Sequence, residues 1–283
     1  IKLRQVSDVP LGALLSGGLD SSIMVAILSK LSDKPVKTFT TGFNHELDEF
    51  SEARIVADHC ATDHKEILLN FDQLSKSLPR ILWHMEFPFG RPSILSNYLV
   101  AEQVKKHVSV AYTGEGSDEL FGGYNRYLVY SKGETISLEE KLDSISSGFF
   151  KDDNSTKNIF SEKVLTFANS QNHQKHEFHK IINENKDASS LNQALYFELK
   201  TEIPGAQTWR IDRCGYAHAV EMREPFLDYN LAQFSLTIPS HFKINHSDGI
   251  NKKYILRKLA TKFLPENIAK RKKFPWGIPF YDF

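Results

Sequence analysis

The segment Ser16–Ser22, with the sequence SGGLDSS, carries residue types that suit phosphate binding. Its two glycines allow a tight turn and a close approach of the backbone to a ligand, and its serines supply hydroxyl donors. A helix that begins within it would present free N–H groups and the positive end of its dipole to an anion. The lysine of a Walker loop is missing, so the pattern predicts a phosphate-binding loop of another type.

Asp20 is the informative residue of this segment. A carboxylate beside bound phosphates repels them unless a cation lies between. Mg²⁺ binds carboxylate and phosphate oxygens together, so it suits that place. The alternative is an ordinary strand-to-helix turn in which Asp20 caps the helix.

A second segment, Gly114–Tyr124 (GEGSDELFGGY), carries the acids Glu115, Asp118 and Glu119. Carboxylates this close together are costly unless a metal ion or a basic group lies nearby. Asp118 could share the Mg²⁺ predicted at Asp20, and Glu115 could act as a base or orient a nucleophile. Glu119 is as easily structural. The alternative for the whole group is an acidic helix start, where carboxylates complement the helix dipole.

Strands and helices must position these segments. Short apolar runs predict strands at residues 11–15, 36–41, 65–69 and 108–113, and helical periodicity predicts helices at 21–31, 51–59 and 95–106. Strands separated by helices pair in parallel through right-handed crossovers. The predicted class is therefore α/β: a parallel sheet with helices on both faces and a helical C-terminal part. Both polar segments follow strand ends, so they would meet at the carboxyl edge of the sheet.

Composition narrows the function classes. The chain has 283 residues, of which 41% are hydrophobic and 25% charged, as in ordinary globular proteins. No apolar run would span a membrane, no signal peptide opens the chain, and Cys60 and Cys214 match no zinc or redox spacing. These features predict a cytoplasmic protein. Lys plus Arg and Asp plus Glu both number 35, which argues against a general nucleic-acid binder.

Four motifs in order resemble one family. SDVPLGALLSGGLDSS (7–22), GEGSDELFGGY (114–124), EMREPFLD (221–228) and YILRKLATKFLPENIAKRKKFPWGIP (254–279) resemble the synthetase domain of glutamine-dependent asparagine synthetases. The resemblance spans residues 1–283 and is weakest between about 128 and 190. It implies the N-type ATP pyrophosphatase fold, also called adenine nucleotide alpha-hydrolase-like. Residues 1–127 would form the sheet-rich ATP-binding core, and 128–283 a mainly helical part that closes the site.

The resemblance also implies a two-step reaction that uses ATP and Mg²⁺. The side-chain carboxylate of aspartate, the presumed substrate, attacks the α-phosphate of ATP and releases pyrophosphate. Ammonia then displaces AMP to form asparagine. The positions implied to bind the nucleotide are Leu15, Ser16, Gly17, Gly18, Asp20, Ser21, Ser22, Thr41 and Gly114. Among the acids, Asp20 and Asp118 match the magnesium ligands.

Other positions are implied to act on the substrates. Glu115 matches the glutamate that contacts the intermediate and incoming ammonia, and Asp48 and Arg91 fall near positions associated with the acidic substrate. Lys273 aligns with the catalytic lysine, with the adjacent Lys272 as the alternative. An ammonium group there would stabilise charge that develops on the α-phosphate. A solvated basic run is the other interpretation.

The resemblance implies a glutaminase domain, either upstream in the full-length protein or in another chain, and a possible homodimer. Three alternatives remain: a related adenylating cyclase that forms a β-lactam or a peptide macrolactam, a tRNA-modifying ATP pyrophosphatase, and a non-catalytic nucleotide-binding module. Glutamate at position 115 favours amide formation over ring formation. In the third motif, Glu221 and Arg223 are predicted to form a buried structural ion pair, with a catalytic role as the alternative.

Overall fold

A computed structural model of the chain describes residues 1–46, 48–86, 91–131, 161–164, 166, 173–247 and 251–273. The chain divides into two compact units. The first comprises residues 1–117, 205–232 and 255–283, and the second comprises residues 118–204 and 233–254. Among the described residues, no helix is long and apolar enough to cross a membrane.

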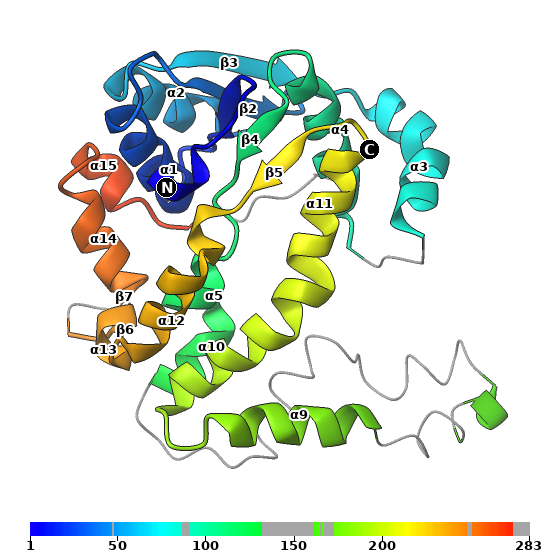
Figure 1. The fold of residues 1–283 in the computed structure, drawn as a ribbon, viewed down its shortest axis with the longest axis vertical. Helices are drawn as coiled ribbons and strands as arrows, with labels where there is room; N and C mark the ends of the chain where they lie inside the picture. The colour runs from blue at the N-terminus through cyan, green and yellow to red at the C-terminus, as the bar shows by residue number, and fades with distance from the viewer. Residues whose placement is uncertain are drawn as a thin grey trace. The chain divides into compact units, whose positions relative to one another are not determined.

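The first unit is built on a five-stranded parallel sheet of order β3-β2-β1-β4-β5 (Figure 1). Its strands are β1 (Leu11–Leu14), β2 (Lys37–Gly42), β3 (Asp63–Leu68), β4 (Val110–Tyr112) and β5 (Glu221–Arg223). The central strand β1 is buried at Ala13, which pairs with Thr38 of β2 and with Tyr112 of β4. The parallel sheet predicted from the alternating pattern is thus confirmed.

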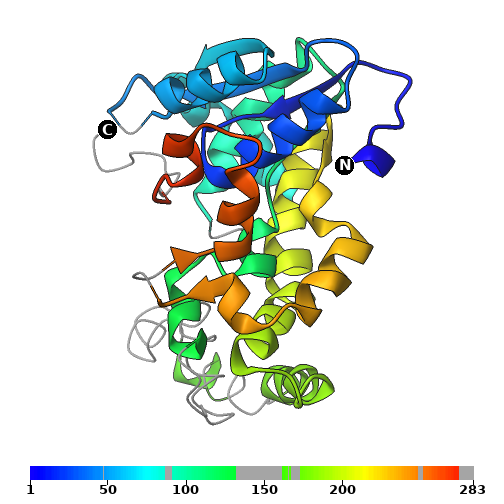
Figure 2. The same cartoon turned by 90° about the vertical axis from the view of Figure 1, so that its left-hand side faces the viewer.

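Helices cover both faces of this sheet, as predicted. They are α1 (Leu19–Lys30), α2 (Phe50–His59), α3 (Phe71–Met85), α4 (Ser93–Lys105), α11 (Thr208–Tyr216) and α15 (Glu266–Ala269). The strand order runs one way from β1 to β3 and the other way through β4 and β5, so right-handed crossovers put the two sets of helices on opposite faces. Helix α1 contacts α2 and α15 (Figure 2), whereas α3, α4 and α11 contact one another.

Each element predicted in the first half ends within two residues of its prediction. Helix α3 and strand β5 are among the described elements that the prediction lacks. Helix α3 contains Pro79, which ordinarily ends a helix, and β5 has only three residues, too few to show a period. Strand β5 is held by its pairing with β4. Sheet strands are therefore not confined to residues 1–127, because residues 205–232 and 255–283 return to the first unit.

The second unit is mainly helical in its described part. Its elements are the 3₁₀-helix η2 (Asn125–Ser131), α9 (His173–Glu184), α10 (Ser190–Lys200), α13 (Ser240–Lys243) and the antiparallel pair β6 (Ile244–Asn245) and β7 (Asn251–Lys252). Its core gathers side chains from η2, α9, α10 and β6, including Tyr127, Leu195 and Phe197. The short elements α5 (Ser117–Phe121), η3 (Ile203–Gln207), α12 (Tyr229–Thr237) and α14 (Tyr254–Ala260) lie where the sequence passes from one unit to the other.

Candidate active site

The two polar loops meet at the carboxyl edge of the sheet, as the sequence predicts. Strand order reverses between β1 and β4, and this switch point is where open α/β sheets bind ligands. The loop after β1 leads into α1, and the loop after β4 begins at Thr113. A Cβ atom at Gly114 would lie 3.1 Å from the Ser21 amide nitrogen and 3.3 Å from the Asp20 Cβ. Only a glycine leaves this space open between the two loops.

The loop after β1 is held by its own serines. The Ser16 amide donates to the Ser21 hydroxyl at 3.2 Å, and the Gly18 amide donates to the Ser16 hydroxyl at 3.2 Å. Gly18 is the N-cap of α1, so no side chain caps the first turn of that helix. The N-terminus of this twelve-residue helix therefore faces the loop, in the arrangement that binds phosphates.

Gly17 is the residue on which this turn depends. Its φ is +70°, and a Cβ there would lie 2.5 Å from the carbonyl carbon of Glu52 and 2.6 Å from the amide nitrogen of Ala53. We expect Gly17→Ala to destabilise the chain by about 1–3 kcal/mol and to weaken ATP binding, because the loop must move away from α2. Calorimetry and a nucleotide titration measure the two effects.

Gly205→Ala is the matched control for that variant, because a Cβ at Gly205 meets nothing within 4 Å. It should change neither stability nor nucleotide affinity. Equal losses in the two variants would show that the packing of Gly17 against α2 does not hold the loop.

Asp20 points toward the second loop. Its Oδ1 accepts a hydrogen bond from the Ser117 hydroxyl at 2.7 Å. Burial lowers the pKa of Arg257, and the negative charge of Asp20 acts against that shift, so the two side chains lie within electrostatic range. The Arg257 guanidinium also donates to the carbonyl oxygens of Ala269 and Arg271. A cation thus lies near the loop after β1 and holds the segment that leads to Lys272 and Lys273.

Each acid of the second loop has a partner that sequence reasoning did not identify. Glu115 accepts a hydrogen bond from Arg210 at 3.1 Å in the first unit. In the second unit, Asp118 lies 2.8 Å from the ammonium nitrogen of the buried Lys253. Glu119 is 1% exposed and accepts a hydrogen bond from the hydroxyl of Tyr124, which favours the structural alternative for this residue.

Arg210, on α11, organises a charged cluster that the sequence analysis missed. It is 7% exposed, and besides Glu115 it binds the Ser93 hydroxyl at 2.8 Å. Glu224 lies near this cluster. Its pKa is raised to about 7, mainly by burial and also by the charges of Glu115 and Asp212, while the charge of Arg210 acts in the opposite sense. No local spacing could reveal the cluster, because α11 is about 95 residues beyond Glu115.

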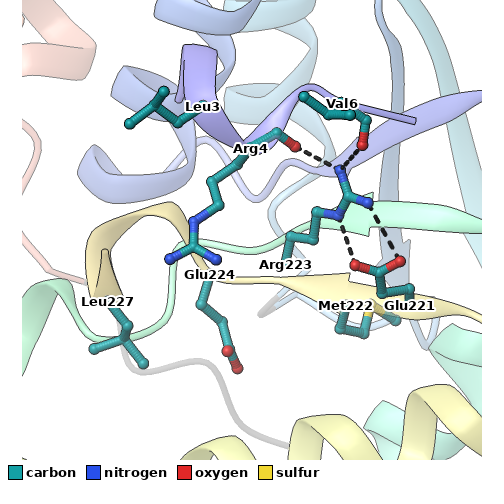
Figure 3. A pocket seen from close by; sticks show the side chains of 8 residues that line it. All are labelled: Leu3, Arg4, Val6, Glu221, Met222, Arg223, Glu224 and Leu227. Atoms are coloured by element: carbon teal, nitrogen blue, oxygen red, sulfur yellow. Dashed lines mark hydrogen bonds and ion pairs between the residues drawn. The ribbon is translucent and has the colours of Figure 1, made fainter. Parts of the chain in front are cut away.

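A cavity of about 360 Å³ lies between the N-terminal segment and β5. Figure 3 shows its lining residues, which are Leu3, Arg4, Val6, Glu221, Met222, Arg223, Glu224 and Leu227. Arg223 donates to the carbonyl oxygens of Arg4 at 2.5 Å and Val6 at 2.9 Å, and so fastens the N-terminal segment to the sheet. The predicted ion pair with Glu221 is present at 2.7 Å, but it is not buried, because Glu221 is 46% exposed.

The structure gives the other predicted nucleotide-binding residues different environments. Leu15 is buried, and its carbonyl accepts a hydrogen bond from the Thr40 hydroxyl. Ser22 is fully buried at the start of α1, whereas Ser21 forms part of the loop bonding. Thr41 lies in β2, half-buried near its carboxyl end.

The two residues predicted to bind the acidic substrate, Asp48 and Arg91, also lie in different environments. Asp48 accepts hydrogen bonds from the amides of Phe43 at 2.9 Å and His45 at 3.0 Å, so its carboxylate holds the turn after β2. Arg91 is half-buried just before α4, and its carbonyl accepts a hydrogen bond from the Ile94 amide.

The basic segment after α15 is fastened near the loop. Arg271 binds Glu49 at 2.6 Å and lies 3.4 Å from Glu52, and the backbone of Glu52 packs against Gly17. Lys272 and Lys273 follow it and are exposed. Residues 274–279, which complete the fourth motif, lie outside the described residues.

A family model described as asparagine synthase matches residues 1–282. The chain belongs to this family. The glutamine-hydrolyzing asparagine synthetase 1 of Bacillus subtilis (strain 168) is 30% identical to it over 314 aligned positions, which cover 99% of the chain and 48% of that protein. The human glutamine-hydrolyzing asparagine synthetase is 28% identical over 285 positions, covering 96% of the chain and 40% of that protein. The asparagine synthase chain thus spans about half the length of these curated relatives or less.

Among solved structures, a predicted subunit of tRNA methyltransferase from Methanocaldococcus jannaschii is 14% identical, with 93% of each chain covered and a TM-score of 0.33. That score is too low to bear on chemistry. The asparagine synthase family assignment rests on the match over residues 1–282 and agrees with the resemblance of the four motifs.

Proposed function

We propose that this chain is an ATP-dependent amide ligase that adenylates the side-chain carboxylate of aspartate and transfers ammonia to it. The observation that carries the proposal is the meeting of two loops at the switch point. One of them is a glycine- and serine-rich helix start, and the other carries Glu115. A phosphate site beside a carboxylate is what adenylation followed by amine attack requires. Membership of the asparagine synthase family supports the same reaction.

In this proposal the loop from Ser16 to Ser22 binds the phosphates of ATP, and Leu15, Thr41 and Gly114 border the adenine. Backbone amides and the positive end of α1 attract the phosphates, and the loop's internal hydrogen bonds keep it in shape before ATP arrives. Preorganised donors of this kind stabilise pyrophosphate as it leaves.

Magnesium fits the residues at this loop. Asp20 and the serine hydroxyls offer only oxygen donors, which Mg²⁺ prefers, and Gly114 leaves open space beside Asp20. When bound, Mg²⁺ neutralises the charge between the carboxylate and the phosphates. Asp118 is the second proposed ligand, and it would have to exchange the ammonium group of Lys253 for the metal.

Three further side chains complete the proposed roles. Glu115, oriented by Arg210, would contact the acyl-adenylate and the incoming ammonia. Lys273, or else Lys272, would stabilise the charge on the α-phosphate. Arg91 would bind the acidic substrate. Asp48 would do so only by giving up its hydrogen bonds to the turn after β2.

The curated relatives are named for glutamine hydrolysis, which is a property of those longer proteins. We propose that a glutaminase domain, in the same protein or in another chain, supplies ammonia to this one, and that the protein acts in the cytoplasm, with a homodimer as a candidate assembly. A cyclising enzyme of the same chemistry is the second candidate. By the resemblance described above, a glutamate at position 115 favours the amide-forming alternative.

The test is release of AMP and pyrophosphate from ATP and Mg²⁺ with ammonium, in the presence and absence of aspartate. Aspartate-dependent AMP with asparagine as the product is the expected result. An amine-bearing carboxylic acid that cyclises, while aspartate gives no AMP, would favour the second candidate. ATP binding without AMP from any carboxylic acid would indicate a nucleotide-binding module.

A further inference from the structure

Glu224 is a carboxyl group that the proposed roles do not use. It follows β5 directly, and the register of β4 with β5 pairs Tyr112 with Arg223. The next residues along the two strands are Thr113 and Glu224, and the Thr113 amide donates to the Arg223 carbonyl at 2.9 Å. Glu224 therefore leaves the carboxyl edge of the sheet beside the loop that carries Glu115.

No hydrogen bond or ion pair of the Glu224 carboxyl group is found in the described part of the chain. The Oε1 atom is buried there without a hydrogen-bond partner. In Figure 3 the side chain extends away from the guanidinium groups of Arg4 and Arg223, which bind other groups. Buried polar atoms are nearly always paired, so an unpaired one marks a place where a water molecule or a polar ligand binds.

A second unpaired atom lies in the same cluster. Arg210 is more than nine-tenths buried, and its Nε has no partner among the described residues, although its other nitrogens bind Ser93 and Glu115. An unpaired donor and an unpaired acceptor near one ion pair indicate a place for a small polar ligand that can both donate and accept. Ammonia has both properties, with three N–H groups and one lone pair.

Glu115 and Glu224 differ in the charged groups that surround them. Glu115 is bound by the Arg210 guanidinium, so its carboxylate is already engaged as a hydrogen-bond acceptor. Glu224 is half-buried, with its Oε1 atom fully buried, and it is near the negative charges of Glu115 and Asp212 as well as the positive charge of Arg210; its pKa is raised to about 7. A carboxylate with a raised pKa is a stronger base than an ordinary carboxylate, and it is matched to a reaction near neutral pH.

We propose that Glu224 accepts the proton that the nitrogen nucleophile must lose when it attacks the acyl-adenylate; this inference rests on the proposed function. The nitrogen lone pair forms the C–N bond, and the bond from the acyl carbon to the AMP oxygen breaks with its electrons leaving on AMP. The nitrogen then carries one proton too many. That proton passes to the Glu224 carboxylate, and the neutral amide remains.

The experiment separates the two half-reactions in the wild type and in Glu224→Gln, which keeps the shape of the protonated acid. Aspartate-dependent exchange of pyrophosphate into ATP, measured without ammonium, reports adenylation. Asparagine formation, measured at a constant concentration of un-ionised ammonia from pH 5.5 to about 8.5, reports the nitrogen step. We expect exchange to be unchanged in the variant and asparagine formation to fall about 10²-fold.

The pH dependence of asparagine formation distinguishes a proton-accepting role of Glu224 from a purely structural one. Glu224 must be deprotonated to accept a proton, so the wild-type nitrogen step should rise with pH through about 7 and then level off, and the variant should lose this rise. Hydroxylamine is a weaker base than ammonia, so the nitrogen of its adduct loses its proton to water more readily, and hydroxylamine should partly restore the variant. Glu221→Gln, a half-exposed carboxyl on the same strand, is the matched control and should behave as wild type.

Two results would overturn the inference while leaving the proposed function intact. One is an unchanged rate of asparagine formation in Glu224→Gln with normal exchange, and the other is a wild-type nitrogen step without an ionisation near pH 7. The second needs no variant, so it decides the question even if Glu224→Gln does not fold. Absence of exchange in the wild type would instead count against the proposed function itself.

Discussion

Asp20→Asn is expected to reduce AMP formation by about 10²–10³-fold, the largest loss of activity that the site predicts. The change keeps the shape of the side chain and can preserve the hydrogen bond from Ser117. It removes the negative charge that would hold Mg²⁺ beside the phosphates. Steady-state AMP formation, measured over a range of Mg²⁺ concentrations, tests this, and the variant should need more Mg²⁺ to reach half its maximal rate.

Two further variants distinguish a metal-binding role of Asp20 from a structural one. Asp33→Asn makes the same change at an exposed position just beyond the other end of α1, so it should leave AMP formation unaltered. Ser117→Ala removes the hydrogen bond but keeps the Asp20 charge, so it should cost less than Asp20→Asn. A loss in Ser117→Ala as great as in Asp20→Asn, with no change in Mg²⁺ dependence, would indicate that Asp20 only joins the two loops.

Arg126→Leu is expected to destabilise the second unit by about 3–5 kcal/mol, the largest effect on stability that we predict. Glu198 is 2% exposed and accepts hydrogen bonds from Arg126 at 2.6 and 2.5 Å and from the Tyr127 hydroxyl at 2.5 Å. Burial and the charge of Glu198 hold the pKa of Tyr127 well above its usual range, so that hydroxyl remains a donor. Without the guanidinium, a buried carboxylate loses its cation.

Hydrogen exchange of the α10 amides under native conditions measures this effect within the unit that contains the pair. Arg54→Leu is the matched control, because Arg54 binds Glu66 with the same two-bond geometry, but the side chain of Glu66 is 27% exposed whereas that of Glu198 is 3% exposed. The side chains of the two arginines, Arg54 and Arg126, are 62% and 42% exposed. Such an exposed pair contributes less than about 1 kcal/mol. Removing both Arg126 and Glu198 should recover part of the loss. Equal effects of the Arg126 and Arg54 variants would show that burial does not set the strength of these pairs.

Sequence reasoning predicted the parts of this protein that are written in local patterns. Runs of apolar residues predict buried strands, so the sheet could be predicted. The glycines of Ser16–Ser22 predict a turn with a positive φ, so the glycine-rich loop after β1 could be predicted as well. The carboxyl-edge position of the two loops then follows from the geometry of parallel sheets.

The charged cluster could not be predicted in the same way. Glu115 and Arg210 are 95 positions apart, and no periodicity connects them. In the third motif, the sequence analysis singled out Glu221 and Arg223. Arg223 binds Glu221 and also holds the N-terminal segment through the Arg4 carbonyl. The carboxyl oxygen without a hydrogen-bond partner in the described part of the chain belongs instead to Glu224. Burial and the neighbours brought by folding decide which acid becomes a base, and neither is visible in a local pattern.

The most direct test of the central claim is AMP formation by this chain from ATP and Mg²⁺ with ammonium, with and without aspartate. We predict AMP and pyrophosphate in equal amounts, dependent on aspartate, with one asparagine formed for each AMP. Firm ATP binding without AMP, whether or not aspartate is present, would contradict the assignment of this site as an adenylating amide ligase.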